Sequence, residues 1–354
     1  SVPYYLGYGV NMGNMSFGYK DAVLDFVQDG KTLKFTGSVG LDKDIQKIFK
    51  SVYQNKFNKK MLNYIPENHL GYVSLNINSE EYIKQMPALI DRYYGPIALE
   101  YGEFISIVAT ALEISLDEKA IGKVVKGDHL LFINEVQKVN REYIDYVYDD
   151  DYNYEEVTKT KEEYIPNFLW MFTSEDQRLF QKILNYAVNR SVAMLNDGIY
   201  TIQEDEDDLP FYVLMKDDIV FIGNNESQIG EIKNNRFKGV NDAKIKKSIS
   251  QHSMSLVGHS NGIPDMVNKL DIPVMEVWKE TLAELPRYGD IYINASRLKG
   301  NRINAEMGVE FPADDGGALK YLLKKLIRNF DADSDNDTQD ETEAAAEVEA
   351  EIVE

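Results

Sequence analysis

The sequence predicts an α+β protein built from tandem β-α-β-β units, with a further helix after some of them and mainly antiparallel sheets that carry helices on one face. Two stretches predict the repeat, and both open on the tripeptide Tyr-Ile-Pro, at Tyr64 and at Tyr164. Each continues through a β-like apolar run, a Ser followed by two acidic residues, and an amphipathic helix pattern. A weaker third copy begins near Ser253.

The first part of the chain predicts the end of a partial unit. Asp29-Gly30 stands between two β-prone runs, at 17–27 and 31–36, which is a strong hairpin signal. A helix pattern with Ile45 and Val52 on its apolar face follows. The expected domains are a partial unit at 1–63, repeat units at 64–163, 164–251 and 252–330, and a disordered acidic tail at 331–354.

Within the three units we expect one strand, one helix and then a strand pair. The expected second and third strands lie at 104–116 and 129–136 in the first unit, at 192–202 and 211–222 in the second, and at 290–294 and 304–311 in the third. Ser174 and Gln177 have the spacing of a capping box, which predicts that both side chains cap the helix of the second unit. A Leu-rich helix at 318–330 closes the third unit.

Composition narrows the classes of function. A chain of 354 residues with 44% apolar and 27% charged residues is typical of a soluble protein with more than one core. Its net charge of −21 argues against nucleic-acid partners, which need clustered cations. The chain has no cysteine, and its longest apolar stretch is too short to span a bilayer. Because it opens on Ser1 without a methionine, we expect a processed or truncated product.

The sharpest catalytic motif is Gly258-His259-Ser260-Asn261-Gly262, which matches the G-x-S-x-G nucleophile elbow. A strand pattern precedes it and a helix pattern follows, as an elbow requires. All four histidines precede Ser260, however, whereas the α/β-hydrolase order places the His last. We therefore interpret Ser260 or Asn261 as a helix cap. A serine hydrolase remains the alternative, because triads are recognised by geometry.

Aromatic and acidic residues alternate between the first two full units. The tyrosines that carry this pattern are Tyr143, Tyr146, Tyr148, Tyr152 and Tyr154. As structure, the segment is an acidic loop or hairpin tip. As function, exposed Tyr beside carboxylates is typical of a surface that recognises carbohydrate or protein. The candidate ligand-binding residues are Tyr146, Tyr148, Tyr152 and Tyr154.

The acidic tail begins with Asp331, Asp333 and Asp335, which are spaced like the start of a calcium loop. The sixth position of that loop is Asn336 where glycine is needed, and the twelfth is Thr342 where a bidentate Glu is needed. We therefore expect a solvated tail and no metal site. The glycines lack the spacing of a phosphate-binding loop, so we expect no cofactor.

Several of these features together resemble an uncharacterised domain family of exported Bacteroidetes lipoproteins. They are the Pro-led strand that enters a Ser-capped helix at Tyr64 to Met86, the hairpin and helix before it, and the strand pair that runs into Phe311-Pro312 and a Leu-rich helix. The resemblance implies a cell-envelope location and a lipid-anchoring cysteine upstream of this chain. It supplies no catalytic residues. We expect a non-enzymatic protein that binds a protein or glycan partner through the surfaces between its units.

Overall fold

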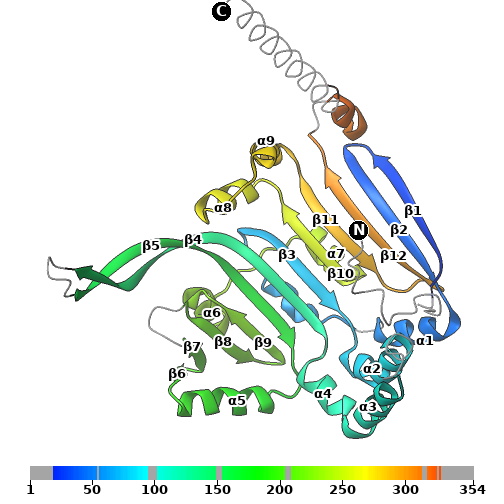
Figure 1. Cartoon of the computed structure of the whole chain (residues 1–354), viewed down its shortest axis with the longest axis horizontal. Coiled ribbons are helices and arrows are strands. Elements are labelled where there is room, and N and C mark those ends of the chain that lie inside the picture. The colour runs from blue at the N-terminus through cyan, green and yellow to red at the C-terminus, as the bar shows by residue number, and fades with distance from the viewer. Residues whose placement is uncertain are drawn as a thin grey trace, which may run out of the picture.

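The computed structural model describes residues 19–53, 56–94, 102–148, 154–203, 209–312, 317–324 and 327. In this part of the chain twelve strands form one sheet, in the order β1-β2-β12-β11-β10-β3-β4-β5-β9-β8-β7-β6, and every pair is antiparallel (Figure 1). The mixed α+β class with a large antiparallel sheet is thus confirmed.

The strands are β1 (Tyr19–Asp29), β2 (Thr32–Leu41), β3 (His69–Asn76), β4 (Asp128–Tyr148), β5 (Tyr154–Thr173), β6 (Ala193–Asn196), β7 (Ile199–Ile202), β8 (Phe211–Lys216), β9 (Ile219–Gly223), β10 (His252–His259), β11 (Asp290–Ser296) and β12 (Arg302–Glu310). The helices are α1 (Lys43–Val52), η3 (Lys59–Asn63), α2 (Ser79–Tyr94), α3 (Gly102–Ser115), α4 (Glu118–Val124), α5 (Arg178–Asn189), α6 (Glu226–Lys233), α7 (Ala243–Gln251), α8 (Ile263–Lys269), α9 (Glu276–Glu284) and η5 (Leu285–Arg287). Residues 318–324 are also helical.

The first hairpin and helix form as the sequence predicts. Asp29 pairs with Thr32 across a two-residue turn in which Gly30 has φ 60°, a conformation that glycine adopts at no steric cost. The Asp42 side chain accepts hydrogen bonds from the first-turn amides of α1 and so caps that helix. Ile45 and Val52 of α1 are buried.

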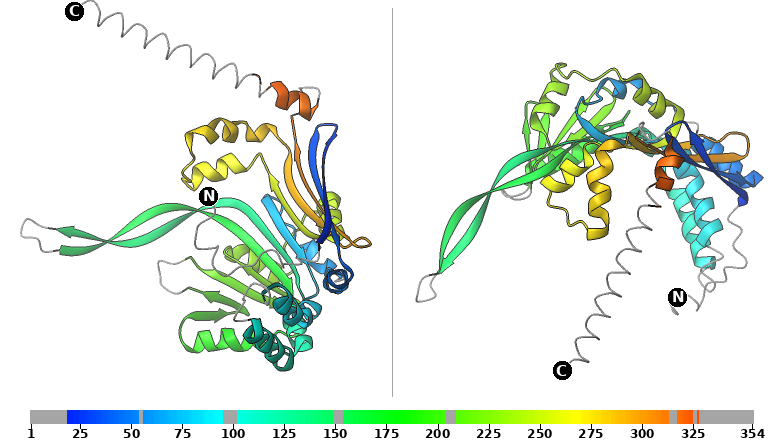
Figure 2. Two further views of the ribbon diagram at one scale, coloured as in Figure 1. Left: turned by 45° about the vertical axis from the view of Figure 1, so that its right-hand side comes forward. Right: turned by 90° about the horizontal axis from the view of Figure 1, so that it is seen from above.

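Helices pack on both faces of the sheet, not on one as expected. The main core lies on one face, where Phe132 of β4 and Phe221 of β9 are fully buried under η3, α6 and α7. We call this the core face. On the other face α5 covers only one end of the sheet, around Phe172 and Val213. Seen from above, α2, α3, α8 and α9 project from that second face, whereas α6 and α7 lie on the opposite side of the sheet (Figure 2).

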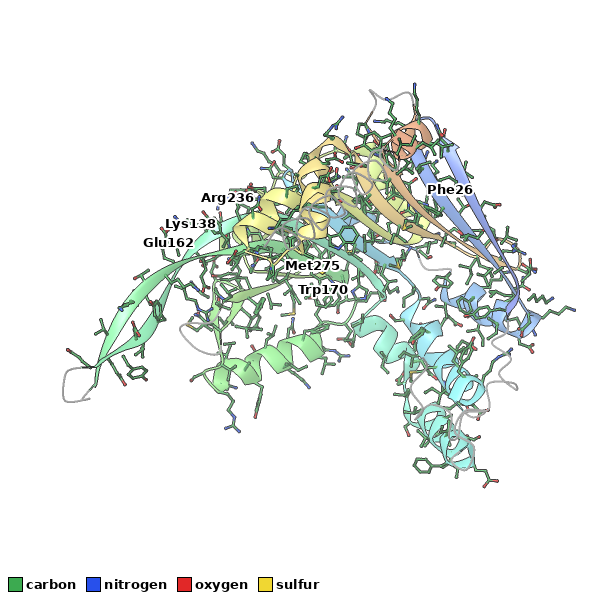
Figure 3. All side chains as sticks on the ribbon, turned by 45° about the horizontal axis from the view of Figure 1, so that its top comes forward. Phe26, Lys138, Glu162, Trp170, Arg236 and Met275 are labelled. Atoms are coloured by element: carbon green, nitrogen blue, oxygen red, sulfur yellow. The ribbon has the colours of Figure 1, made fainter. Side chains whose placement is uncertain are left out.

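The tyrosine-rich segment belongs to a long two-stranded arm. β4 and β5 stay paired from Val136↔Pro166 out to Tyr148↔Tyr154, beyond the last partners of β4 on β3 and of β5 on β9. Ion pairs join the two strands, and Figure 3 shows Lys138 beside Glu162, whose charged atoms are 2.7 Å apart. The predicted hairpin tip is therefore confirmed for the flanking strands, while residues 149–153 lie outside the described residues.

The strands on the two sides of the β10–β3 pair follow a related order. Outward from this pair the sheet reads β10, β11, β12, β2, β1 on one side and β3, β4, β5, β9, β8, β7, β6 on the other. Both halves also share an order along the chain, because β3 and β10 are each followed by helices and then by a hairpin, β4–β5 or β11–β12. The expected boundary between residues 163 and 164 falls inside β5.

Four expected elements differ in the structure. Residues 104–116 lie mostly in helix α3, because a mostly apolar run, interrupted only by Ser, Thr and Glu113, has no clear periodicity that separates a strand from a helix. The expected single strands at 192–202 and 211–222 are instead the hairpins β6–β7 and β8–β9, which turn at Asp197 and Asp217 with positive φ. The capping box is wrong: Gln177 makes no side-chain cap, and its amide donates to the Asp217 carbonyl.

Candidate functional site

Charged side chains from three elements meet at one edge of the core face. His259 ends β10 and Asp290 begins β11, and the sheet register places these two residues opposite each other. His259 Nδ1 donates to Asp290 Oδ1 at 2.7 Å, and Lys244 of α7 donates to the other carboxylate oxygen at 2.7 Å. The hydrogen bond from His259, helped by Lys244, holds the pKa of Asp290 well below its usual range despite partial burial. Asp290 is therefore a permanent carboxylate.

A cavity of about 330 Å³ lies beside this cluster, between α7 and the strands. The side chains that enter it from the sheet include Lys34, Tyr72, Tyr292, Asn294, Glu306 and Glu310. The alternation of each strand explains this lining, because every second residue of β11 and β12 faces the same side. A concave site with a few polar groups and aromatic rings is the usual form of a small-molecule site.

The Tyr292 ring packs closely against Gly308 of β12. A Cβ atom added to Gly308 would come within 2.3 Å of Tyr292 Cζ, so only glycine leaves room for the ring in this position. Burial raises the pKa of Tyr292, and a hydrogen bond with Glu306 raises it further. The phenol therefore stays neutral and its ring is fixed in the lining of the cavity.

One acceptor in the cavity lining is left without a partner. Among the described residues, no hydrogen bond reaches the buried Oδ1 of Asn294, which extends from β11 beside Tyr292. A buried polar atom without a partner costs about 1–3 kcal/mol, so native structures usually satisfy it through water or a ligand. Asn294 lines the cavity, so a small rotation of its side chain would bring this oxygen within reach of a ligand hydroxyl.

A second cavity, of about 940 Å³, lies on the other side of His259. His69 of β3 lines it and packs against His259, with the ring centroids 4.8 Å apart. Burial, with the charge of His259 as a smaller cause, lowers the pKa of His69 to about 4. His69 is thus a neutral aromatic spacer at ordinary pH.

Ser260 is close to this cluster but has no base on its hydroxyl. The side chain is 1% exposed, and Oγ lies 2.5 Å from the Tyr288 carbonyl oxygen and 2.7 Å from that of Gly289. The hydroxyl therefore ties the turn after β10 to the start of β11. The expected strand, turn and helix around Ser260 are present, but the capping interpretation is wrong, because Gly262 is the N-cap of α8 and no side chain caps it.

The other predicted site residues lie away from the cavity or outside the description. Tyr146 stands exposed on the β4 side of the arm, and the register of the arm pairs Tyr148 with Tyr154. Tyr152 and the three tail residues Asp331, Asp333 and Asp335 lie outside the described residues.

The sequence does not predict the pairs that His259 forms with Asp290 and with His69. No local signal marks either pair, because the residues meet only when β3, β10 and β11 assemble.

Two tests of chemistry concern only the described part of the chain. No group of three or more His, Asp or Glu residues there is arranged to hold a metal ion. In the same residues, every helix is too short or too polar to cross a membrane.

No protein-family model, no curated protein and no solved structure matches this chain. The assignment of the site therefore depends on its geometry.

Proposed function

We propose that this chain is a non-enzymatic binding protein whose ligand is a neutral, hydroxyl-rich molecule of the glycan class. The cavity under α7 is its site, and the observation that carries the proposal is the fixed Tyr292 ring beside the unpartnered Asn294 oxygen. A sugar offers both complements, an apolar C–H face for the ring and hydroxyl donors for the oxygen.

The charges around the cavity favour a neutral ligand because they compensate one another. Lys244 lies 2.7 Å from Asp290 and 3.6 Å from Glu310, and Lys31 lies 3.3 Å from Glu310. Lys34 is likewise paired with Asp29 at 3.0 Å. A phosphate or carboxylate ligand would have to break these pairs, whereas sugar hydroxyls can hydrogen-bond to groups that remain paired.

The Tyr292 ring supplies the apolar contact that a sugar needs. An aromatic side chain held in one position loses little conformational entropy when a ligand stacks on it. Tyr72, from β3, adds a second ring to the lining. Its pKa is raised, chiefly by burial, so this phenol is neutral as well.

A glycan array tests the proposal directly. We expect the full chain to bind a defined subset of neutral glycans, and Tyr292→Ala or Asn294→Ala to weaken that binding at least tenfold. The matched control is Tyr146→Ala on the arm, an exposed tyrosine that we expect to be neutral. If the wild type binds no glycan, the proposal is wrong. If Tyr146→Ala abolishes binding and Tyr292→Ala does not, the site is the arm.

The serine-hydrolase alternative lacks geometric support, because the Ser260 hydroxyl donates to two main-chain carbonyls. A fluorophosphonate probe separates the two functions. We expect no labelling of the wild type, whereas labelling that disappears in Ser260→Ala would show a reactive serine and replace the binding proposal.

We further propose a cell-envelope location, supported by the resemblance to exported lipoproteins. Fractionation of the source cells tests it, and recovery in the cytosol would contradict it.

The tandem β-α-β-β units are a proposal of the same kind, supported by the common order of β3 to β5 and β10 to β12. An overlay of β3 on β10 that left the two following hairpins apart would contradict these units.

A further inference from the structure

The face of the sheet opposite the core carries an exposed row of apolar side chains across five strands. Cross-strand pairing places its members side by side, namely Phe26, Phe35, Met307, Ile293 and Leu256. These residues are between 37% and 50% exposed. Figure 3 shows Phe26 on the outermost strand and Trp170 further along the sheet, where the same row continues through Val73 and Leu131.

A second row lies beside the first on the same face and is equally free of charge. Its members lie two residues along each strand from those of the first row, and the register aligns them as Leu24, Gly37, Ala305, Ala295 and Met254. Leu24 is 75% exposed. We call the ten residues of these two rows the open apolar strip. A soluble protein rarely leaves so continuous an apolar surface without a partner.

Neighbouring helices border the strip but leave it uncovered. At one end Trp170 joins the cluster that α5 covers. Along one side the helix at 318–324 packs on Leu33 and Val309 through Ala318 and Tyr321. The members of the strip belong to neither cluster. Its occupant must therefore come from a part of the chain that the structure does not describe, or from another molecule.

The first eighteen residues have the composition that this strip requires. They contain no Asp, Glu, Lys, Arg or His, and nine of them are Val, Leu, Met, Phe or Tyr. Apolar and small residues alternate from Leu6 to Gly13, so one side of an extended segment there is apolar and the other carries only glycine and asparagine. The first charged residue is Lys20, inside β1.

The segment is also attached to a strand at the edge of the open apolar strip. It joins the sheet at Tyr19, the first residue of β1, and β1 is the outermost of the five strands. Five strands span about 20 Å at roughly 4.8 Å per interval. Eighteen residues reach about 60 Å when extended, so the segment can cross the strip and return. Because it is tethered, its effective concentration at the strip exceeds that of a free partner at ordinary concentrations.

We propose that residues 1–18 dock in cis on the open apolar strip and cover it. The occupant is thus a segment of this chain, bound through its Leu6, Tyr8, Val10 and Met12 side. The proposal is independent of the glycan site, which lies on the opposite face of the sheet.

Cysteine cross-linking tests the docking cleanly, because the chain contains no cysteine. In the full chain we pair Tyr8→Cys with Met307→Cys and treat the protein with a short bis-maleimide. The matched control pairs Tyr8→Cys with Val23→Cys. Val23 is 47% exposed against 42% for Met307 and lies nearer the segment along the chain, but on the opposite face.

We expect intramolecular cross-linking through Met307→Cys to exceed that through Val23→Cys at least tenfold, at a yield independent of protein concentration. Equal yields would show that tethering alone brings the cysteines together and would overturn the proposal. Cross-links between two chains would show that a second copy covers the strip. The absence of any cross-link to Met307→Cys would indicate that a different molecule covers it. Both of these results would also overturn the proposal.

A second measurement uses single-cysteine chains and does not depend on the cross-linker. We expect Tyr8→Asp with Val10→Asp to raise the maleimide reaction rate of Met307→Cys at least tenfold, because a charged segment cannot stay on an uncharged surface. The rate at Val23→Cys should stay within twofold. An unchanged rate at Met307→Cys would contradict docking.

Discussion

The pKa of His69 makes a sharp prediction about how acid destabilises the fold. His69 packs among the rings of Phe132, Tyr72 and His259, with centroid separations of 5.2, 6.2 and 4.8 Å. Burial lowers its pKa from 6.5 in the unfolded chain to about 4 in the folded protein. Between these two values the unfolded chain binds a proton that the folded protein does not. The free energy of unfolding therefore falls as the pH falls through this window.

The size of the effect follows from the same two values. The difference between 6.5 and about 4 corresponds to about 3.4 kcal/mol at 1.36 kcal/mol per pH unit. The ring is only partly buried, so solvent screening reduces the expected contribution to about 1.5 kcal/mol. His69→Phe retains the ring contacts and removes the titration.

Urea unfolding at pH 7.5 and pH 4.5 measures the effect. Carboxylates that titrate in the same range are present in both proteins, so they cancel in the comparison. We expect the wild type to lose about 1.5 kcal/mol more than His69→Phe on acidification. His129→Phe removes a second histidine whose pKa burial lowers, on the other face beside Trp170, so it too should lose less than the wild type on acidification. Equal losses in the wild type and His69→Phe would refute the reasoning.

Three further predictions concern packing and the turn after β10. Gly71→Ala should lower the free energy of unfolding by about 2 kcal/mol or more, because a Cβ there would lie 2.3 Å from the Val257 carbonyl oxygen. Its cross-strand partner Gly258 has open space around it, so Gly258→Ala should lower the free energy by at most about 1 kcal/mol. Equal losses in urea unfolding would contradict the close approach at Gly71. Phe132→Ala, at a fully buried position, should cost about 3–5 kcal/mol in the same assay, and a loss below 1 kcal/mol would place the core elsewhere. Ser260→Ala should lower the free energy of unfolding by about 1–3 kcal/mol, because two carbonyls lose their donor, and an unchanged midpoint would argue against this bond.

The sequence predicts local features of this fold well. Asp29-Gly30 predicts the β1–β2 turn because the turn chemistry is contained in two residues. The helix over α1 follows from its apolar periodicity, and the structure adds a cap from Asp42 that was not predicted. The error at 104–116 has a physical reason as well, since a mostly apolar run without clear periodicity fits a helix and a strand equally.

The candidate site is harder to predict because it is assembled by long-range pairing. His69 and His259 lie far apart in the chain and meet only because β3 and β10 are neighbours. The motif singles out Ser260, but the direction of its hydroxyl depends on Tyr288 and Gly289, just before β11, which the motif does not contain. The ring position of Tyr292 depends on Gly308 of another strand.

The central claim is that the cavity under α7 binds a neutral glycan on Tyr292. The most direct test is a calorimetric titration of the strongest glycan from the array into the wild type and into Tyr292→Ala. The account predicts saturable binding with one site per chain, weakened at least tenfold in Tyr292→Ala and unchanged in Tyr146→Ala. Equal affinity in the wild type and Tyr292→Ala would contradict it.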